Sequence, residues 1–429
     1  MRLFFALLLF ISALYSSEFN FYKKGSNDAK KPTLLVIGGI HGDEPGGYFA
    51  ASILATHYNI TDGNLWIVPD LNKNSMMANS RGINGDMNRK FANISKDDKD
   101  YKIVEDIKKI IAKPEVDLIL NLHDGHGFYR DSDENWLYNT KAWGQTCVID
   151  QIFMDSNHTY SDLHTLAQNA SKHINSNLID ANHKFNVRNT NTKLYDKEMQ
   201  QTLTYFALQN HKPAFAIESS KNLSNLEEKV FYQLNAIESF MNQMGIKFSR
   251  NFTLDSKNLI KIINNYGKVT INNNFILNLN KLKKSLSYIP LQSSLNEFAF
   301  THPLGYIKKI HSGYEIFIGN KKVSTLYPSY HKNGTCDKNM LFLVDGEMKS
   351  FDFTSEIFVN DDIKVVKTDS SVRANIIGFT RTGLIDESDV TVSLKDFDKR
   401  FSIDTPNRSY RIEFYQKSHF CGMVLVHFK

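Results

Sequence analysis

The stretch "LLVIGGIHGDEPGG", from Leu34 to Gly47, joins an apolar run to a polar, glycine-rich loop. The run is continuous in Leu, Val and Ile, which is typical of a strand buried on both faces of a sheet. The loop then presents His41, Asp43 and Glu44 within four residues. Such a loop is either a polar surface turn or one half of a metal site, and the remainder of the chain decides between them.

Three further apolar runs follow the same pattern, and each ends in polar residues. They are "LWIVPDLN" (65–72), "VDLILNLHDG" (116–125) and "PAFAIESS" (213–220). Segments of helical periodicity separate the runs. One predicted helix has Asp97 and Asp98 in its first turn, and another begins with Ser224 and Glu227, which have the spacing of a capping box. Strands that alternate with helices predict a mixed, mainly parallel sheet covered on both faces. Residues that handle ligands are expected at the carboxyl ends of such strands.

After about residue 248 the helical periods fade, and short strands separated by turns replace them. A break between two groups of strands is expected near "YHKNGTC" (330–336). The chain is therefore predicted to be α/β over 18–248, followed by two smaller β-rich modules. The middle module is predicted at 249–332 and the last at 333–429, with an immunoglobulin-like sandwich as the expected form of the last.

Composition and charge are those of an ordinary globular protein. The chain is 41% hydrophobic and 23% charged, and its formal net charge is +5 over 429 residues. No basic run interleaved with aromatic residues is present, so nucleic acid is not an expected partner.

The first residues, "MRLFFALLLFISALYSSEF", predict a secretory signal peptide at 1–17. A single Arg precedes an apolar segment, and the small residues Ser16 and Ser17 follow it. The alternative is an uncleaved anchor, which also places the body of the protein outside the cytoplasm. No later run reaches the ~20 apolar residues of a spanning helix, so no membrane span is expected after cleavage. The predicted location is the periplasm.

The three cysteines, Cys147, Cys336 and Cys421, form neither a disulfide framework nor a thiolate metal site. Cys336 and Cys421 both lie in the C-terminal region and are the favoured pair.

Potential metal ligands follow two of the predicted strands, and together they make a full ligand set. His41 and Glu44 follow the first strand, and His123 follows the third, in "LNLHDG". Two His and one Glu are a sufficient set of protein ligands for a catalytic Zn²⁺, with the fourth position left for water. The sequence therefore predicts one zinc ion bound by His41, Glu44 and His123, with His126 as the alternative to His123.

The loop "ANSRGINGDMNRKF" lies between the two ligand segments and contains Arg81, Asn88 and Arg89. Guanidinium groups bind carboxylates through a fork of donors. Asn88 and Arg89 are therefore expected to clamp a substrate carboxylate, and the alternative is a solvated basic loop. Glu218 ends the strand "PAFAI" and is either a cap of the next helix or a general base and acid beside the metal.

These motifs together resemble the zinc carboxypeptidases of the carboxypeptidase A type: His-x-x-Glu, then Asn-Arg, then His, then a Glu on a late strand. The "GGIHGDEPGG" loop with "GDMNRKF" resembles the bacterial branch that merges into succinylglutamate desuccinylase and aspartoacylase-like enzymes. The signal peptide, "HDGHGFY" and the β-rich C-terminal half are similar to the peptidoglycan carboxypeptidases that set cell curvature in helical bacteria. The resemblance covers residues 32–245 for the wider family and the whole chain for the narrower one.

The resemblance implies a role for each matching residue. The three predicted zinc ligands match the family's ligands, and Glu218 matches the catalytic Glu. Asn88 and Arg89 match the residues that hold the terminal carboxylate of the substrate. Arg81 matches the Arg that steadies the carbonyl oxygen as it becomes an oxyanion.

Two further positions, Trp143 and Thr204, fall where the narrower family lines its substrate pocket. One position departs from the pattern. Carboxypeptidase A-type enzymes carry a Tyr over the substrate before the catalytic Glu, and Tyr205 lies nearby without a clear match.

The resemblance implies a carboxypeptidase-like fold and a periplasmic zinc enzyme that removes meso-diaminopimelate from a muropeptide tripeptide, leaving a dipeptide. Its expected partners are peptidoglycan muropeptides, with the β-rich modules as candidates for binding other wall-shape proteins. Two alternatives remain. An aspartoacylase-like or desuccinylase-like deacylase would share the metal site, but the signal peptide opposes it. A non-catalytic wall-binding scaffold would not require Glu218.

Overall fold

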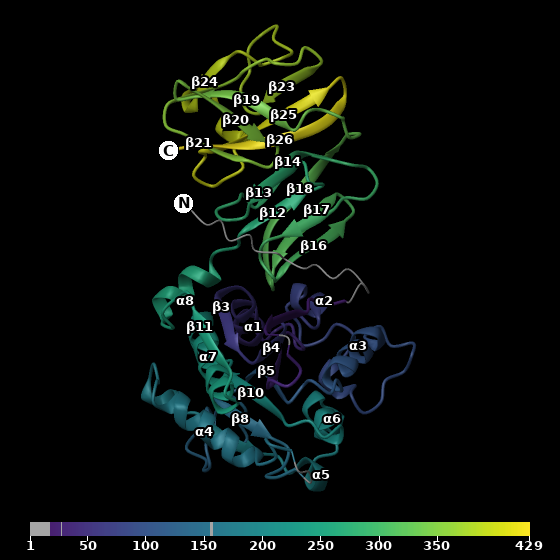
Figure 1. The fold of residues 1–429 in the computed structure, drawn as a ribbon, viewed down its shortest axis with the longest axis vertical. Helices are drawn as coiled ribbons and strands as arrows, with labels where there is room; N and C mark the ends of the chain where they lie inside the picture. The colour runs from purple at the N-terminus through teal and green to yellow at the C-terminus, as the bar shows by residue number, and fades with distance from the viewer. Residues whose placement is uncertain (1–17, 27, 155–157) are drawn as a thin grey trace. The chain divides into compact units, whose positions relative to one another are not determined.

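The computed structural model describes residues 18–429 with the exception of 27 and 155–157, so the predicted signal peptide lies outside the described residues (Figure 1). The chain divides into two compact units, Met1–Asn251 and Phe252–Lys429. No helix in the described part of the chain is long and apolar enough to cross a membrane.

The first unit is built on a seven-stranded sheet of order β1-β4-β2-β5-β10-β8-β9. The four strands expected from the apolar runs are adjacent and parallel: β4 (Asn64–Val68), β2 (Thr33–Ile37), β5 (Leu118–Gly125) and β10 (Ala214–Ser220). Each is buried along its whole length, as continuous apolar runs predict. β1 (Tyr22–Gly25) and β8 (Thr146–Ile149) pair antiparallel with this group, and β9 (Asn186–Asn189) is parallel to β8. The predicted mixed, mainly parallel sheet is confirmed.

Helices cover both faces of the sheet (Figure 1). On one face, α3 (Tyr101–Ile111) and α6 (Leu203–Gln209) share a core with side chains of β2, β4 and β5. α7 (Leu226–Gln243) packs against both α1 (Pro45–His57) and α4 (Leu163–Asn175), and all three helices pack against the sheet. The smaller elements of the unit are α2 (Lys73–Met77), α5 (Thr192–Tyr195), β3 (Tyr58–Asp62), β6 (Phe128–Tyr129), β7 (Tyr138–Asn139) and β11 (Lys247–Arg250).

Two predicted helix starts are wrong. α3 begins at Tyr101, so Asp97 and Asp98 precede it, and Asp98 instead forms an ion pair with Lys90 at 2.8 Å. α7 begins at Leu226 with Asn225 as its N-cap and no side-chain capping bond, so the expected capping box does not form. Ser224 lies one residue too early in the chain to cap this helix.

The first element of the second unit is α8 (Ser256–Ile263), and strands follow it, with two short 3-10 helices at Leu394–Asp396 and Lys399–Phe401. Two sheets come first, of order β13-β12-β15 and β14-β18-β17-β16. Their strands are β12 (Lys268–Ile271), β13 (Phe275–Asn278), β14 (Ser285–Leu291), β15 (Phe298–Phe300), β16 (Gly305–Ile310), β17 (Gly313–Ile318) and β18 (Lys321–Tyr330).

The last residues form two four-stranded sheets, β20-β19-β22-β24 and β21-β26-β25-β23. Their strands are β19 (Asn339–Val344), β20 (Glu347–Asp352), β21 (Glu356–Val359), β22 (Asp362–Val365), β23 (Val372–Ile376), β24 (Thr391–Ser393), β25 (Ser409–Gln416) and β26 (His419–Phe428). Phe342 and Ile363 from one sheet share a core with Ile412 and Val424 from the other, as in a β-sandwich.

Residues on both sides of the predicted 332/333 boundary contact one another within the second unit. Glu356 of β21 forms an ion pair with Lys268 and accepts a hydrogen bond from Asn278 Nδ2 at 3.0 Å. The 249–332 and 333–429 modules therefore stay a prediction. Cys336 and Cys421 form a disulfide with Cα atoms 5.6 Å apart, which confirms the favoured pair.

Candidate active site

The loop after β2 is folded tightly enough to fix its two candidate ligands. It leads directly into α1, so Glu44 is the N-cap residue and Pro45 follows in the first turn. A Cβ on Gly42 would lie 2.0 Å from the Ser75 carbonyl oxygen, so only glycine fits there. The Gly46 amide donates a hydrogen bond to Asp124 Oδ2 at 2.9 Å, which ties the start of α1 to the end of β5.

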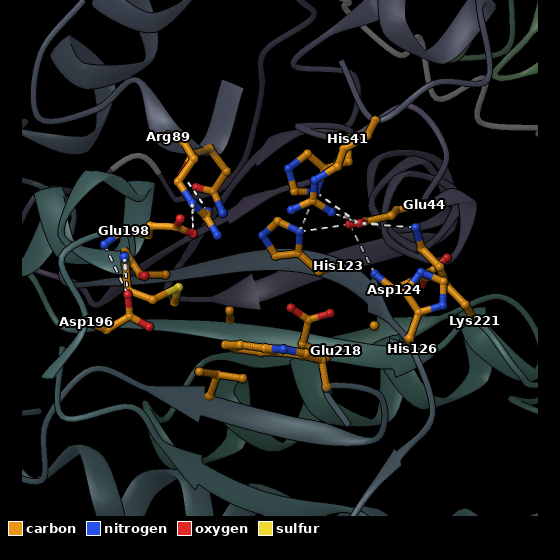
Figure 2. Close-up of a pocket in the computed structure, with 18 residues that line it drawn as sticks. His41, Glu44, Arg89, His123, Asp124, His126, Asp196, Glu198, Glu218 and Lys221 are labelled. Carbon is orange, nitrogen blue, oxygen red and sulfur yellow. Dashed lines mark hydrogen bonds and ion pairs between the residues drawn. The ribbon is translucent and has the colours of Figure 1, made fainter. Parts of the chain in front are cut away.

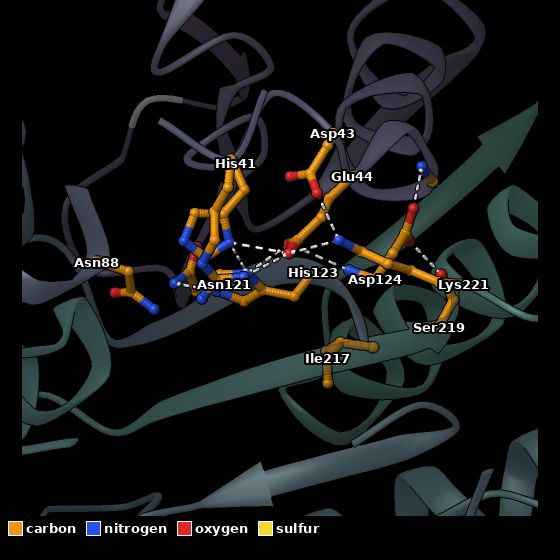
Figure 3. A network of polar contacts seen from close by, with 12 residues as sticks. His41, Asp43, Glu44, Asn88, Asn121, His123, Asp124, Ile217, Ser219 and Lys221 are labelled. Atoms are coloured by element: carbon orange, nitrogen blue, oxygen red, sulfur yellow. Dashed lines mark hydrogen bonds and ion pairs between the residues drawn. The ribbon is translucent and has the colours of Figure 1, made fainter. Parts of the chain in front are cut away.

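Three buried ligand atoms from this loop and from β5 converge (Figure 3). His41, Glu44 and His123 each offer an atom within 4.8 Å of the others, and each residue is at most 3% exposed. The Glu44 carboxylate contacts both rings: Oε1 is 3.0 Å from His41 Nδ1, and Oε2 is 2.8 Å from His123 Nδ1. Two imidazole nitrogens and one carboxylate match the ligand set of a catalytic zinc site.

The electrostatics of this cluster fit a bound cation. Burial opposes a charge on His41, yet the Glu44 carboxylate and a hydrogen bond to Asp86 raise the pKa of His41 to about 9. Burial lowers the pKa of His123. A closed site that stabilises positive charge on an imidazole can also stabilise a divalent metal ion, which requires neutral imidazole ligands.

Asp86 connects the metal-binding cluster to the arginine loop, residues 78–91, which contains Arg81 and Arg89. No sequence motif singled out Asp86 as a site residue. Its Oδ1 lies 2.8 Å from His41 Nε2 and accepts the Asn88 amide at 2.8 Å. Its Oδ2 accepts from Arg81 Nε at 3.0 Å and lies 3.9 Å from Arg89 Nη1. A carboxylate on the outer nitrogen of a histidine holds the other nitrogen toward a metal. Its position two residues before Asn88, in "GDMNR", is the only signal the sequence carries.

His123 has an amide as its outer partner. Asn121 Nδ2 lies 2.8 Å from His123 Nε2, while the buried Asn121 Oδ1 has no hydrogen-bond partner among the described residues. The oxygen and nitrogen of an amide exchange places by a half-turn. In that orientation Oδ1 would accept the Nε2 proton, which leaves His123 Nδ1 unprotonated for a metal.

Glu218 lies opposite the cluster on the next strand. It is the register partner of His123 in the parallel pair of β10 and β5. Figure 2 shows its carboxylate directed toward the histidines. Burial, together with the nearby Glu44 carboxylate, raises the pKa of Glu218 well above the usual range. Among the described residues none donates a hydrogen bond to this carboxylate, so its oxygens are open to a water or a substrate.

The arginine loop carries the three remaining residues expected to hold substrate. Arg81 is 48% exposed, and its Nη1 donates to Glu44 Oε1 at 3.2 Å. Asn88 is buried, and its Oδ1 accepts the amide of Leu203 at 2.9 Å, so its Nδ2 is the group left for a ligand. Arg89 is less exposed, at 29%, and its guanidinium lies at the opposite side of the cluster from Glu44 (Figure 2).

One cavity of about 350 Å³ brings together all nine residues singled out in the sequence. These residues are His41, Glu44, Arg81, Asn88, Arg89, His123, Trp143, Thr204 and Glu218. His126 also lines the cavity but is exposed and outside the metal-binding cluster. Tyr205 lines a different cavity, so it is not placed over this site.

The two pocket-lining positions are held by neighbours outside the metal site. The half-buried Trp143 ring stacks on the Arg188 guanidinium, 3.8 Å from the ring centroid. Thr204, in the first turn of α6, is 5% exposed and lies 3.2 Å from Thr202 through the two hydroxyl oxygens. The same cavity is also lined by Lys221, Asp196 and Glu198, which no sequence motif indicated.

Comparisons with known proteins agree with this site. Residues 4–264 match the catalytic family described as the carboxypeptidase controlling helical cell shape. Residues 334–429 match the C-terminal domain of metallo-carboxypeptidase. No curated protein matches the chain.

Solved structures of the cell shape determinant protein Csd4 from Helicobacter pylori are similar over nearly the whole chain. The tripeptide-bound form is 35% identical with a TM-score of 0.88, and the match covers 96% of this chain and 100% of that chain. The mDAP-bound form, described as a D,L-carboxypeptidase, is 35% identical with a TM-score of 0.89, over 95% and 100% of the two chains. The first family match spans more than half of this chain, and the 35% identity to the Helicobacter pylori protein extends over nearly all of it. The chain therefore belongs to the metallocarboxypeptidases that control helical cell shape.

Proposed function

We propose that this carboxypeptidase is a periplasmic zinc enzyme that removes the C-terminal meso-diaminopimelate from a muropeptide tripeptide and leaves a dipeptide. One observation carries the proposal: a metal-binding cluster, the open buried carboxylate of Glu218 and the guanidinium groups of Arg81 and Arg89 line one cavity. Similar Helicobacter pylori structures with bound tripeptide and bound mDAP support the choice of substrate. The apolar N-terminal segment supports the choice of compartment.

His41, Glu44 and His123 would hold the metal ion. A divalent ion held there would act as a Lewis acid, which polarises a carbonyl group and lowers the pKa of a bound water. Zinc is proposed because two nitrogens and one carboxylate oxygen are the usual protein ligands of a catalytic zinc site.

Glu218 would act as general base and then as general acid. Its carboxylate takes a proton from the attacking water and returns it to the amine of the departing residue. Burial, together with the Glu44 carboxylate, raises the pKa of Glu218, which favours the protonated form that this second role requires.

Arg89 and Asn88 would bind the carboxylate of the departing residue. The Arg89 guanidinium has two long ion-pair contacts, each of 3.9 Å, with Asp86 Oδ2 and Glu198 Oε2, and its Nη1 donates to the Asn88 carbonyl at 3.1 Å. Because both ion pairs are long, the guanidinium can turn toward an anion that it binds more closely. Arg81 contacts Glu44 and Asp86 and reaches the cavity beside the metal cluster, where it would stabilise the carbonyl oxygen as negative charge develops.

Mass spectrometry of purified muropeptides before and after incubation tests this function. Loss of diaminopimelate from tripeptide supports it. Hydrolysis of N-acylated aspartate or succinylglutamate with untouched tripeptide would instead favour a deacylase.

Elemental analysis of purified variants tests the metal and its ligands. Wild-type protein should retain one zinc ion per chain, and His123→Ala should lose it. His126→Ala should retain zinc, because His126 is exposed and outside the cluster. The opposite pattern would show that the second histidine ligand is wrongly assigned.

A further inference from the structure

Lys221 is a cation inside the catalytic cavity that none of the roles above uses. It follows directly after β10, where its backbone amide donates to the Gly125 carbonyl at 2.7 Å. Its side chain is 16% exposed and lines the same cavity as Glu218. In Figures 2 and 3 it lies beyond Glu44, on the side away from Arg89 and Asn88.

The ammonium group of Lys221 has donors to spare. Its Nζ lies 2.7 Å from Asp43 Oδ2 and 3.6 Å from Glu44 Oε1. An ammonium carries three N–H donors, and only the contact with Asp43 is of hydrogen-bond length. A lysine ammonium is a cation at neutral pH, and the Asp43 carboxylate beside it holds this charge in the cavity.

Two cations therefore line the cavity on opposite sides of the metal-binding cluster, Arg89 on one side and Lys221 on the other. If Arg89 holds the carboxylate of the departing residue, the scissile carbonyl lies over the metal ligands. The acyl part of the substrate then continues beyond Glu44, where Lys221 is. A partly buried ammonium at that place favours an anionic group on the acyl side.

We propose that Lys221 binds a free carboxylate on the acyl residue of the substrate, and so selects it. A glutamate joined through its γ-carboxyl has this chemistry, because its α-carboxylate remains free close to the scissile carbonyl. This inference rests on the proposed function and adds an acyl-side requirement to it. Lys221 is then a specificity-determining residue, distinct from the arginine that holds the departing residue.

Two tripeptides and three proteins test the proposal. The peptides differ only in the α-group of the γ-linked glutamate, which is a carboxylate in one and a carboxamide in the other. Wild type should prefer the carboxylate by roughly 10- to 100-fold in kcat/KM, the effect of one hydrogen-bonded charge. Lys221→Met should lose most of this preference, mainly through the carboxylate peptide.

Lys229→Met is the matched control. Lys229 is similarly buried, at 13% exposure, and lies 3.9 Å from Asp124 Oδ2, but it does not line the cavity. The control should keep the wild-type preference. Equal rates for the two peptides in wild type, or an unchanged preference in Lys221→Met, would overturn the proposal.

Calorimetric binding of the two dipeptide products separates this inference from the proposed function. The zinc-loaded wild type should bind the carboxylate dipeptide more tightly than the carboxamide, and Lys221→Met should bind both alike. If neither tripeptide is cut, the proposed function fails, and the binding comparison still decides the role of Lys221. Zinc content should be the same in all three proteins, because Lys221 is not a metal ligand.

Discussion

Glu218→Gln should lower turnover by orders of magnitude while leaving the metal site intact. The substitution keeps the size of a side chain that is only 9% exposed, so packing around β10 should be preserved. Glu218 is not a member of the metal-binding cluster, and no described residue donates a hydrogen bond to its carboxylate, so the substitution breaks no hydrogen bond to a described residue. What is lost is the proton transfer itself.

The loss in kcat should be about 10²- to 10⁴-fold, the usual contribution of a positioned general acid–base. This corresponds to roughly 3 to 5 kcal/mol of activation free energy. KM should change little, because Glu218 acts on the chemical step and not on the carboxylate of the substrate.

Single-turnover trimming of the tripeptide, measured beside zinc content, is the assay. The control is Glu134→Gln, since Glu134 is 53% exposed and does not line the cavity. Retention of kcat within tenfold of wild type, with zinc bound, would refute Glu218 as the base. Loss of zinc in Glu218→Gln would show that its role is to support the metal site.

Arg89→Ala should raise KM for the tripeptide and can lower kcat as well, and amidating the substrate's terminal carboxylate should mimic it in wild type; an amidated substrate cut as fast as the acid would show that this is not a carboxypeptidase. Asn121→Ala should weaken zinc binding by about 10- to 100-fold in a chelator competition, because His123 loses its outer partner, and unchanged affinity would contradict the assigned amide orientation. Hydrogen bonds from His427 and Lys268, against partial burial, lower the pKa of Glu356 from 4.5 to about 2, so its stabilisation is complete above pH 4.5 and is lost as the pH falls toward 2. The difference in free energy of unfolding between wild type and Glu356→Gln should therefore shrink across that window in urea titrations, and a difference that grows there would refute the sign.

The parallel centre of the sheet was predictable because its strands are buried on both faces. Short continuous runs of Leu, Ile and Val that alternate with helical segments are typical of parallel strands, and the carboxyl ends of parallel strands share an edge of the sheet. β8 and β9 were missed because four-residue strands such as "TCVI" and "NVRN" carry too short a pattern to stand out.

The site was predictable where a residue type and a strand end coincide, as at His41, His123 and Glu218. Asp86 and Lys221 were not, because their importance lies in contacts that exist only after folding. An Asp in a polar loop and a Lys after a strand are common in any surface segment. The prediction for Asp98 was wrong for a different reason. An acidic residue before a segment of helical periodicity suggested a helix start, but Asp98 pairs with Lys90 and precedes the helix.

The pairing of Glu218 with His123 across β10 and β5 links catalysis to folding. A slip of one residue between these strands would turn one of the two side chains to the opposite face of the sheet. A mispaired molecule would then have no activity at all, however compact it is. The specific activity of a refolded sample therefore measures the fraction of molecules whose central strands have paired in register.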